Sequence, residues 1–461
     1  MKQQSKFQIT NGNCCSSAIV PLHIELNKKE TSSLPVVVIG AGPIGLAAAA
    51  HLAKAGEKFI VLEAGTCVGN YIHQWGHVRL FSPWQYNVDK VARELLEKHG
   101  WDAPSPDEIP TGKELVEGYL EPVANLPEIQ PYIHLNSKVL SVSKKGLDKM
   151  KSANRENVPF VLYVRQNGLI EQIEAKAIID ATGTWGQPNP INADGVWTEN
   201  EKSLQSHIHY GIPDINGNDR DKYLGKRIAV IGSGHSAINT ILELSQLNES
   251  NSDKKIVWIL RKNNVEEAYG GEEKDALQAR GELGLKIHQL VDSGQVEAYT
   301  PYRVQKVLME DEALKIVGDL RGESVSIQGV DEVIVNTGSR PDFSFLNEIR
   351  LHIESATESV EALAPLIDPN LHSCGTVRPH GEIELRQPEE NFYIVGMKSY
   401  GRAPTFLMAT GYEQVRSIVA YLTGDYESAK KVELDLPETG VCSVNLTPTK
   451  QEKSCCNTTF C

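Results

Sequence analysis

The chain has 461 residues, which at roughly 150 residues per domain suggests about three domains. Hydrophobic residues make up 40% and charged residues 23%, which excludes a collagen, a coiled coil and a wholly disordered chain. Lys and Arg number 46 against 60 Asp and Glu, and the net charge of -14 repels phosphate backbones and anionic lipid surfaces. We therefore expect no nucleic-acid partner and no membrane partner.

The N-terminal segment 1–33 is polar and lacks the apolar run of a secretory signal, so we interpret it as a flexible leader of a cytoplasmic protein. The apolar run that follows, Val36–Ala53, approaches the length of a membrane span. It is interrupted by glycines and a proline, however, and a glycine-rich turn explains it better than a membrane helix does.

Residues 34–65 have the pattern of a strand, a turn, a helix and a second strand. Both predicted strands are β-branched, as buried parallel strands are. The turn has the form G-x-G-x-x-G, which allows a tight turn, close approach of a pyrophosphate, and close packing of helix on strand. Glu63 ends the second strand, where its carboxylate can accept hydrogen bonds from ribose hydroxyls. The residues expected to bind this first nucleotide are Gly40, Gly42, Pro43, Ile44, Gly45 and Glu63.

The same pattern begins again at residues 225–263, with the turn in the form G-x-G-x-x-A. The second strand of this unit ends in Arg261 and Lys262 where the first unit has Glu63. A guanidinium pairs with a 2′-phosphate that a carboxylate would repel, so this site should prefer NADPH to NADH. The alternative is that both cations are only solvated loop charges. The turn residues expected to bind are Gly232, Ser233, Gly234, His235, Ser236 and Ala237.

Further elements follow from the same periodicities. We expect an amphipathic helix at 110–126, buried strands at 175–183, 331–338 and 391–396, and a helix at 410–422. The fold class is α/β with two Rossmann-like domains, the NADP-binding domain inserted in the FAD-binding domain. The expected boundaries are a leader 1–33, FAD domain 34–187 and 336–425, NADP domain 188–335, and a flexible tail 426–461 that carries cysteines.

Two dinucleotide sites in one chain have a chemical meaning. A single nicotinamide site needs a substrate as its redox partner, whereas two sites suggest that NADPH passes a hydride to FAD. The first site, with its acid, suits FAD.

The segment 181–190, ATGTWGQPNP, resembles the hinge of the class B flavoprotein monooxygenases, of flavin-containing or Baeyer–Villiger type. The resemblance to this family covers roughly residues 34–425. The resemblance extends to VNTGSRP at 335–341, to Gly69 and Arg79 after the first acid, and to VGMKSYGRAPTFLMATGYEQ at 395–414. It implies a flavin site that also includes Arg79, Val139, Ala181, Thr182, Gly183, Arg340 and Gly396.

Two departures weaken the oxygenase part of this resemblance. Ile72 stands at the family's tryptophan position, with Trp75 three residues later. The fingerprint F-x-G-x-x-x-H is absent, and His207 and His209 occupy roughly its place. Neither histidine has neighbouring carboxylates or cysteines in sequence, so a metal site there is not expected.

The eight cysteines provide evidence about which molecule accepts electrons from the reduced flavin. Cys67 has no partner spaced to form a dithiol, which argues against an internal redox disulfide. The terminal thiols include two vicinal pairs, which are either incidental or able to capture a soft metal or metalloid. These candidate thiols are Cys14, Cys15, Cys455, Cys456 and Cys461.

We therefore expect an NADPH-oxidising flavoprotein, most readily a monooxygenase that acts on a small molecule with molecular oxygen. The alternatives are a reductase of a thiol, disulfide, soft metal or metalloid acceptor that uses the terminal cysteines, and a non-catalytic flavoprotein that senses nucleotides. The sequence identifies neither the substrate nor a catalytic side chain, and it leaves a homodimer open.

Overall fold

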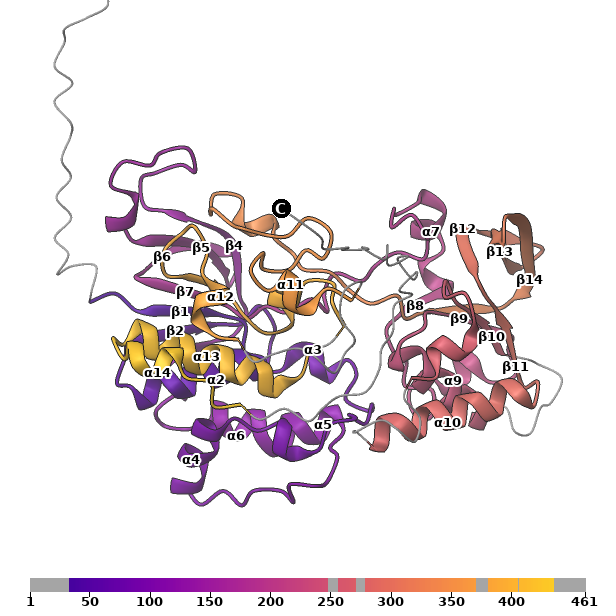
Figure 1. The fold of residues 1–461 in the computed structure, drawn as a ribbon, viewed down its shortest axis with the longest axis horizontal. Helices are drawn as coiled ribbons and strands as arrows, with labels where there is room; N and C mark the ends of the chain where they lie inside the picture. The colour runs from indigo at the N-terminus through magenta and orange to yellow at the C-terminus, as the bar shows by residue number, and fades with distance from the viewer. Residues whose placement is uncertain (1–32, 248–255, 271–277, 370–379, 405, 435–461) are drawn as a thin grey trace, which may run out of the picture.

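The computed structural model describes residues 33–247, 256–270, 278–369, 380–404 and 406–434, which form two lobes joined by two chain segments (Figure 1). The first lobe contains the sheet β16-β7-β1-β2-β3, and the second lobe contains the sheet β11-β10-β9-β15-β8. Both sheets are parallel, and each carries an additional three-stranded antiparallel sheet.

The first parallel sheet is built from short, buried, β-branched strands. Its central strand β1 pairs in parallel with β2 on one side and β7 on the other, so the carboxyl ends of all three strands meet at one edge. The strands of this lobe are β1 (Val36–Ile39), β2 (Phe59–Leu62), β3 (Ile133–His134), β4 (Ser137–Lys144), β5 (Phe160–Gln166), β6 (Leu169–Ala175), β7 (Ala177–Asp180) and β16 (Phe392–Ile394).

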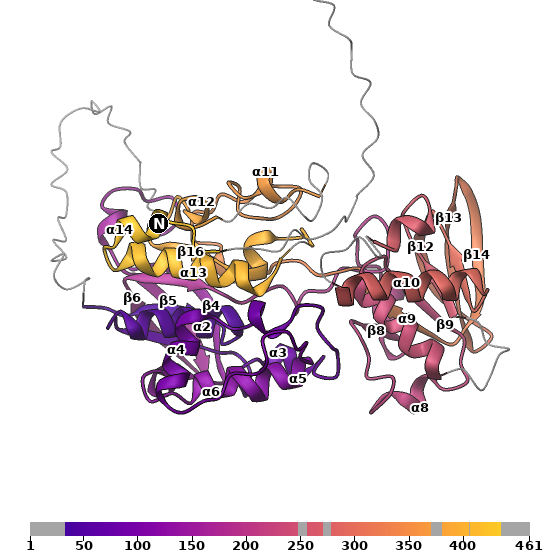
Figure 2. The ribbon, with the colours of Figure 1, turned by 60° about the horizontal axis from the view of Figure 1, so that its bottom comes forward.

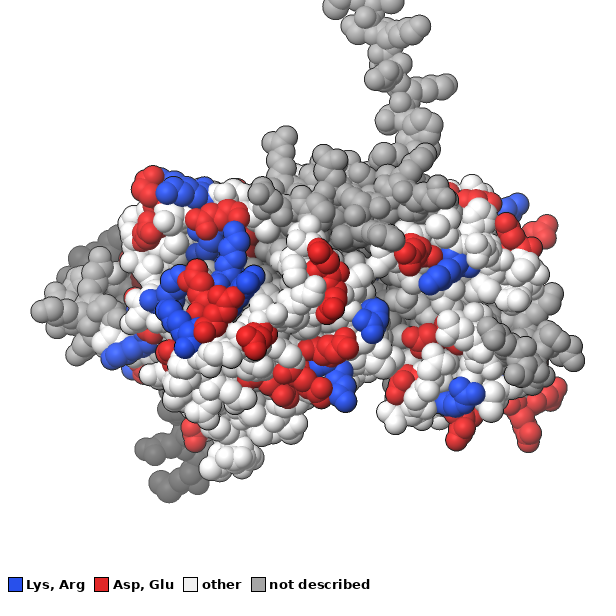
Figure 3. Space-filling view, turned by 90° about the horizontal axis from the view of Figure 1, so that it is seen from below, with Lys and Arg blue, Asp and Glu red and all other residues white. Residues whose placement is uncertain are grey.

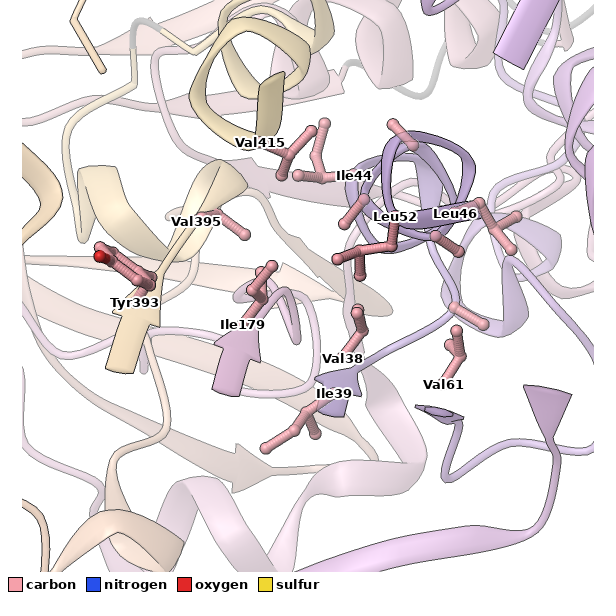
Figure 4. Packing of buried hydrophobic residues seen from close by; sticks show 14 of the residues in the cluster. Val38, Ile39, Ile44, Leu46, Leu52, Val61, Ile179, Tyr393, Val395 and Val415 are labelled. Carbon is pink, nitrogen blue, oxygen red and sulfur yellow. The ribbon is translucent and has the colours of Figure 1, made fainter. Parts of the chain in front are cut away.

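Helices cover this sheet, and two of them, α2 and α13, pack on each other (Figure 2). Ile44, Leu46 and Leu52 of α2 lie over Val38 and Val61 of the sheet, with side chains of α13 beside them (Figure 4). The helices of this lobe are α2 (Pro43–Lys54), α3 (Asn70–His73), α4 (Lys90–Lys98), α5 (Gly112–Leu115), α6 (Glu121–Ala124), α11 (Ala364–Ile367), α12 (Glu382–Leu385), α13 (Met408–Leu422) and α14 (Tyr426–Lys430).

The helix expected at 110–126 is present but is not uniform. A capping box at Thr111 starts α5, and the turn Val116–Leu120 has the wider π-helical hydrogen-bonding pattern before α6 continues. The apolar periodicity found the helix, but it carries no information about this local widening.

The second lobe repeats the strand–turn–helix order around β9, with α9 and α10 packed together beneath the sheet in Figure 1. The antiparallel strands β12–β14 lie at the end of this lobe that is remote from the first lobe (Figures 1 and 2). Its elements are α7 (Glu199–Ser203), β8 (Ile208–Tyr210), α8 (Arg220–Tyr223), β9 (Ile228–Ile231), α9 (His235–Leu247), β10 (Ile256–Ile259), α10 (Gln278–Asp292), β11 (Val296–Tyr299), β12 (Tyr302–Glu310), β13 (Ala313–Leu320), β14 (Glu323–Val330) and β15 (Glu332–Val335).

The two connecting segments between the lobes are hydrogen-bonded to each other. Asn189 N donates to Gly338 O at 2.9 Å, and Arg340 N donates to Gln187 O at 2.9 Å. The hydroxyl of Ser339 reaches that of Thr184 on the opposite segment at 2.9 Å. The connection is therefore a paired two-segment hinge.

No helix among the described residues is long and apolar enough to cross a membrane. On the face drawn in Figure 3, Lys and Arg side chains are interspersed with Asp and Glu. The described residues on that face therefore form no continuous basic surface of the kind that a phosphate backbone requires.

Candidate functional site

The first glycine-rich turn lies at the carboxyl edge of the first sheet, between β1 and α2. Gly40 has φ +102°, and a Cβ there would meet Ala181 O at 2.8 Å. A Cβ on Gly45 would collide with the Gly40 carbonyl, whereas a Cβ on Gly42 would meet no protein atom within 4 Å. Two glycines are thus required by the protein's own packing, and the space at Gly42 is left open, as the approach of a pyrophosphate requires.

The amino end of α2 is also open for an anion. Gly42 is its N-cap and offers no side-chain hydrogen bond, and Pro43 follows in the first turn. The first backbone N–H groups of a helix have no partners within the helix and carry the positive end of its dipole. The residues present therefore fit a dinucleotide phosphate at this turn.

Glu63 lies beside this turn, as its position at the end of β2 predicts. One carboxylate oxygen accepts from Ala41 N at 2.8 Å, and the other accepts from Gly65 N at 2.7 Å. These two bonds fix the carboxylate next to the glycine turn. Val139 lies nearby in β4, two residues after Ser137, whose backbone N–H donates to Glu63 O at 2.8 Å.

Two other segments reach the same edge of the sheet. Ala181–Gly183 follow β7, and Gly396 follows β16, whose neighbour in the sheet is β7. A Cβ on Gly396 would approach the side chain of Ile44 at 3.1 Å. The structure thus brings Ala181, Gly396 and the first turn together from three segments that lie far apart in the sequence.

A buried ion pair under this edge has no counterpart in the sequence analysis. Lys398 Nζ lies 2.7 Å from Asp180 Oδ2, and both side chains are fully buried. The same ammonium donates to Thr182 Oγ1 at 3.1 Å, and the hydroxyl of Thr182 donates to Asp180 at 2.7 Å. The rings of Phe343 and Phe345 flank the ammonium. The sequence signal that could have indicated this ion pair is Lys398 itself, a charged residue in an otherwise buried segment.

The second glycine-rich turn repeats these features between β9 and α9. Gly232 has φ +141°, and a Cβ there would collide with Asn336 O, while a Cβ on Gly234 would meet no protein atom within 4 Å. Ala237 is fully buried against the lobe core, as the third position of the motif requires. Ser233 lies in the same turn, and Ser236 lies in the first turn of α9.

The two cations after β10 differ in their surroundings. Lys262 Nζ donates to Glu267 O at 2.5 Å, so its charge is held within its own loop. Arg261 is exposed at the protein surface. Partial desolvation by neighbouring protein atoms lowers the pKa of its guanidinium, and the positive charges of Arg402 and Arg303 lower it further. Nearby positive charges are favourable for an anionic group such as a 2′-phosphate.

Two arginines expected at the flavin site are engaged elsewhere by protein atoms. The guanidinium of Arg79 donates to Ile109 O and lies 3.9 Å from a carboxylate oxygen of Glu114. Arg340 forms an ion pair with Glu358 beside the hinge. Both therefore support loops next to the turn, and the described contacts place neither guanidinium on the turn itself.

The segment after Glu63 connects the two glycine turns. Gly69 N donates to Ala41 O at 2.9 Å, within the first turn. Further along, the ring of Phe81 lies 5.6 Å from that of His235, the first residue of α9 in the second turn. Trp185 of the hinge donates through Nε1 to Gln74 Oε1 at 2.9 Å. One segment thus contacts both candidate nucleotide sites.

A cleft of about 570 Å³ lies between the lobes next to this segment. The first lobe contributes His73 and His77, and the second contributes His209, Asp214 and Asp219. No residue of either glycine turn lines it. Burial lowers the pKa of His209 below its usual range. Sequence analysis noted His209 without assigning it a role, because the residues around it, Asp219 and Lys222 of its own lobe and His77 of the other, are not adjacent to it in sequence.

Cys67 is the one cysteine among the described residues, and it is partly exposed with its Sγ 3.9 Å from Asn70 Oδ1. The terminal candidate thiols lie outside the described residues. No group of three metal-ligating side chains occurs among the residues that the structure describes.

Comparisons with known proteins show that the chain is similar to flavoenzymes with different named activities. It is 25% identical over 344 residues to a ferredoxin–NADP reductase of Lactobacillus johnsonii, covering 74% of this chain and 85% of that one. The bacillithiol disulfide reductase of Staphylococcus aureus superposes with a TM-score of 0.60 at 18% identity, over 85% of this chain and 99% of that one. The FAD-bound cadaverine monooxygenase of Erwinia amylovora superposes with a TM-score of 0.58 at 14% identity, over 87% of this chain and 98% of that one.

The two structural likenesses show a shared fold: two Rossmann-like lobes, as the sequence predicts. Taken together, the comparisons support an oxidoreductase that uses FAD and NADP(H). The sequence pattern of the pyridine nucleotide-disulphide oxidoreductase family matches residues 37–373, more than half of the chain, and the chain therefore belongs to that family.

Proposed function

We propose that this protein is an NADPH-oxidising flavoprotein monooxygenase that acts on a small molecule with molecular oxygen. The observation that carries the proposal is the segment Gly69–Phe81, which is hydrogen-bonded to the first glycine turn and contacts His235 of the second. Both turns therefore contact one short segment, which supports the transfer of a hydride between nucleotides bound at the two turns. NADPH supplies a hydride to FAD when both are bound, and the reduced flavin supplies electrons to oxygen.

In this proposal, different residues of the first lobe bind different parts of FAD. The open space at Gly42 and the amino end of α2 receive the pyrophosphate. Glu63, already fixed by two backbone donors, presents its carboxylate to the ribose. We assign this nucleotide to the domain 34–187 with 336–425.

The second lobe, 188–335, holds NADPH in the same scheme. Gly234 leaves the matching space for its pyrophosphate, and Arg261 pairs with its 2′-phosphate. The ring of His235 lies at the amino end of α9 and covers the nucleotide from the first lobe's side.

Two features favour an oxygenase over a disulfide reductase. The interlobe cleft is large enough for a small molecule, since such sites occupy roughly 300–1,000 Å³. A dithiol beside the flavin would need two cysteines, and Cys67 is the one that the described residues contain.

A second candidate is an electron-transfer reductase. It is favoured by the relatives named ferredoxin–NADP reductase and bacillithiol disulfide reductase. Such an enzyme would pass flavin electrons to a protein or thiol acceptor without incorporating oxygen. The terminal pairs Cys14–Cys15 and Cys455–Cys456 are its candidate thiols.

Two matched variants test the cofactor assignment. Neither Gly42→Val nor Gly234→Val meets protein atoms at Cβ, so each should fold. Gly42→Val should lose FAD, whereas Gly234→Val should retain FAD but be reduced slowly by NADPH under anaerobic conditions. Stoichiometric FAD in Gly42→Val would overturn the assignment of the first turn.

The oxygenase and the reductase differ in the fate of oxygen. In the proposed oxygenase, an atom from ¹⁸O₂ appears in the oxidised small molecule in step with NADPH consumption. Turnover with a disulfide or ferredoxin acceptor, without ¹⁸O in any product, would instead establish the reductase.

A further inference from the structure

We infer that the interlobe cleft is a third binding site, separate from both nucleotide turns, and that it takes a small hydrophilic cation such as an aliphatic amine or diamine. The inference rests on the proposed function only in calling this molecule the substrate. The binding site itself stands on the cleft's lining, charge and unused hydrogen-bonding groups.

Most of the residues that line the cleft have polar side chains. Among its lining residues, Ile212 and Pro213 are the ones with apolar side chains. Imidazoles, carboxylates, amides and a hydroxyl make up most of the rest. The lining also exposes apolar surface, so it can contact an aliphatic chain. An occupant with polar or charged ends on a short aliphatic chain is therefore the better match.

The charge balance of the cleft is negative. Lys113 and Glu117 line it as an i,i+4 ion pair at 3.7 Å, and so offset each other. Asp214 and Asp219 remain without a cationic partner in the lining. Lys222, which lies near His209, is paired with Glu332 at 3.5 Å.

The two aspartates are held in place but keep free acceptors. Asp214 Oδ2 accepts from Asn218 N at 2.9 Å, and Asp219 Oδ2 accepts from Asp214 N at 2.9 Å. The Oδ1 atom of each accepts no hydrogen bond from the described residues. Two fixed carboxylates with one free oxygen each form a preorganised acceptor pair for an ammonium group.

Two of the three histidines that line the cleft, His73 and His77, belong to the facing first lobe, and His209 belongs to the same lobe as the aspartates. Burial lowers the pKa of His209, so it carries no charge at neutral pH and does not offset the aspartates. His77 Nε2 is buried and has no hydrogen-bond partner among the described residues. His77 and Asp219 line the same cleft from different lobes. A low-dielectric cleft lined by carboxylates focuses its field on a cation.

A charge series in the FAD-loaded full chain tests this inference without any substitution. The probes are 1,4-diaminobutane, 1,4-butanediol and succinate, which share a four-carbon chain and differ in charge. By titration calorimetry, the diamine should bind about tenfold or more tightly than the diol, and succinate should show no binding. Raising the salt concentration should weaken the diamine. Equal affinity for the three probes, or tighter binding of succinate, overturns the inference.

Variants then locate the binding. Asp219→Asn keeps an oxygen acceptor for Asp214 N but removes one charge, and should weaken the diamine about tenfold. The exposed Asp311, at the turn between β12 and β13, provides the matched control Asp311→Asn, which should bind the diamine as the wild type does. Equal weakening in both variants, or none in Asp219→Asn, overturns the site.

The two proposals fail in different experiments. Anaerobic reduction of the flavin by NADPH tests the proposed function, and diamine binding tests the cleft. Diamine binding in a protein whose flavin NADPH does not reduce would refute the function and keep the site. Full reduction with no diamine binding would refute the site alone.

Discussion

Replacing Lys398 with methionine should destabilise the first lobe strongly. The substitution keeps most of the side-chain volume but removes the ammonium that lies 2.7 Å from Asp180 Oδ2. Both side chains are fully buried, so the carboxylate of Asp180 would stay in the interior with only the donors of Thr182. Removing one partner of a buried ion pair costs about 3–5 kcal/mol.

This loss of stability can be expressed as a decrease in the melting temperature, Tm. For a folding unit of about 150–250 residues, each kcal/mol shifts Tm by about 2–4 °C, so Lys398→Met should lower Tm by roughly 6–20 °C. The pair also fixes the turn Gly396–Tyr400 against the end of β7, next to the first glycine turn. FAD content should therefore fall along with Tm.

The assay is thermal unfolding by circular dichroism, with FAD content measured on the same samples. Lys430→Met is the matched control, because Lys430 forms an exposed pair with Glu427 at 3.7 Å in the same lobe. Exposed pairs contribute at most about 1 kcal/mol. A Tm for Lys398→Met equal to that of Lys430→Met would refute the reasoning, because it would mean that Asp180 needs no charged partner.

Three further predictions follow from the sites. Arg261→Ala should reduce the preference for NADPH over NADH about tenfold or more, since a charge-assisted contact contributes about 1.5–3 kcal/mol; an unchanged ratio of reduction rates would place the 2′-phosphate elsewhere. Burial lowers the pKa of Lys144 from 10.5 to about 8, so the cost of its charge is present below pH 8 and disappears towards pH 10.5. Lys144→Met removes this pH-dependent cost together with the hydrogen bond from Nζ to Val158 O, so the free energy of unfolding of the variant relative to the wild type should fall between pH 7 and pH 10, in urea titrations at both pH values. Cys455→Ser with Cys456→Ser should leave NADPH oxidation with a small-molecule substrate unchanged, and loss of that turnover would favour the thiol-linked reductase.

The parts of the fold that repeat a local pattern were predictable from the sequence. The strand of β-branched residues, the glycine turn and the helix that follows are all set within about twenty residues, and both such units appear where expected. The carboxyl edge of the sheet then collects Glu63 and Ala181 by parallel pairing alone.

The cleft and the buried ion pair were not predictable in the same way. Asp180 and Lys398 are more than two hundred residues apart, and nothing in the sequence around either residue indicates the other as its partner. His77 and Asp219 become neighbours only because the hinge places one lobe against the other. Local sequence carries periodicity and turn chemistry, but it carries no record of which loops meet across a domain boundary.

The paired hinge constrains how the two lobes can move. A single connecting strand would let one lobe both swing and twist relative to the other. Here the segments at Gln187–Asn189 and Gly338–Arg340 are hydrogen-bonded side by side, so a twist would shear those bonds while a swing leaves them intact. We therefore expect any relative motion of the lobes to be mainly a swing about this paired hinge. A nucleotide carried on the second lobe would then approach the first lobe in a restricted set of orientations.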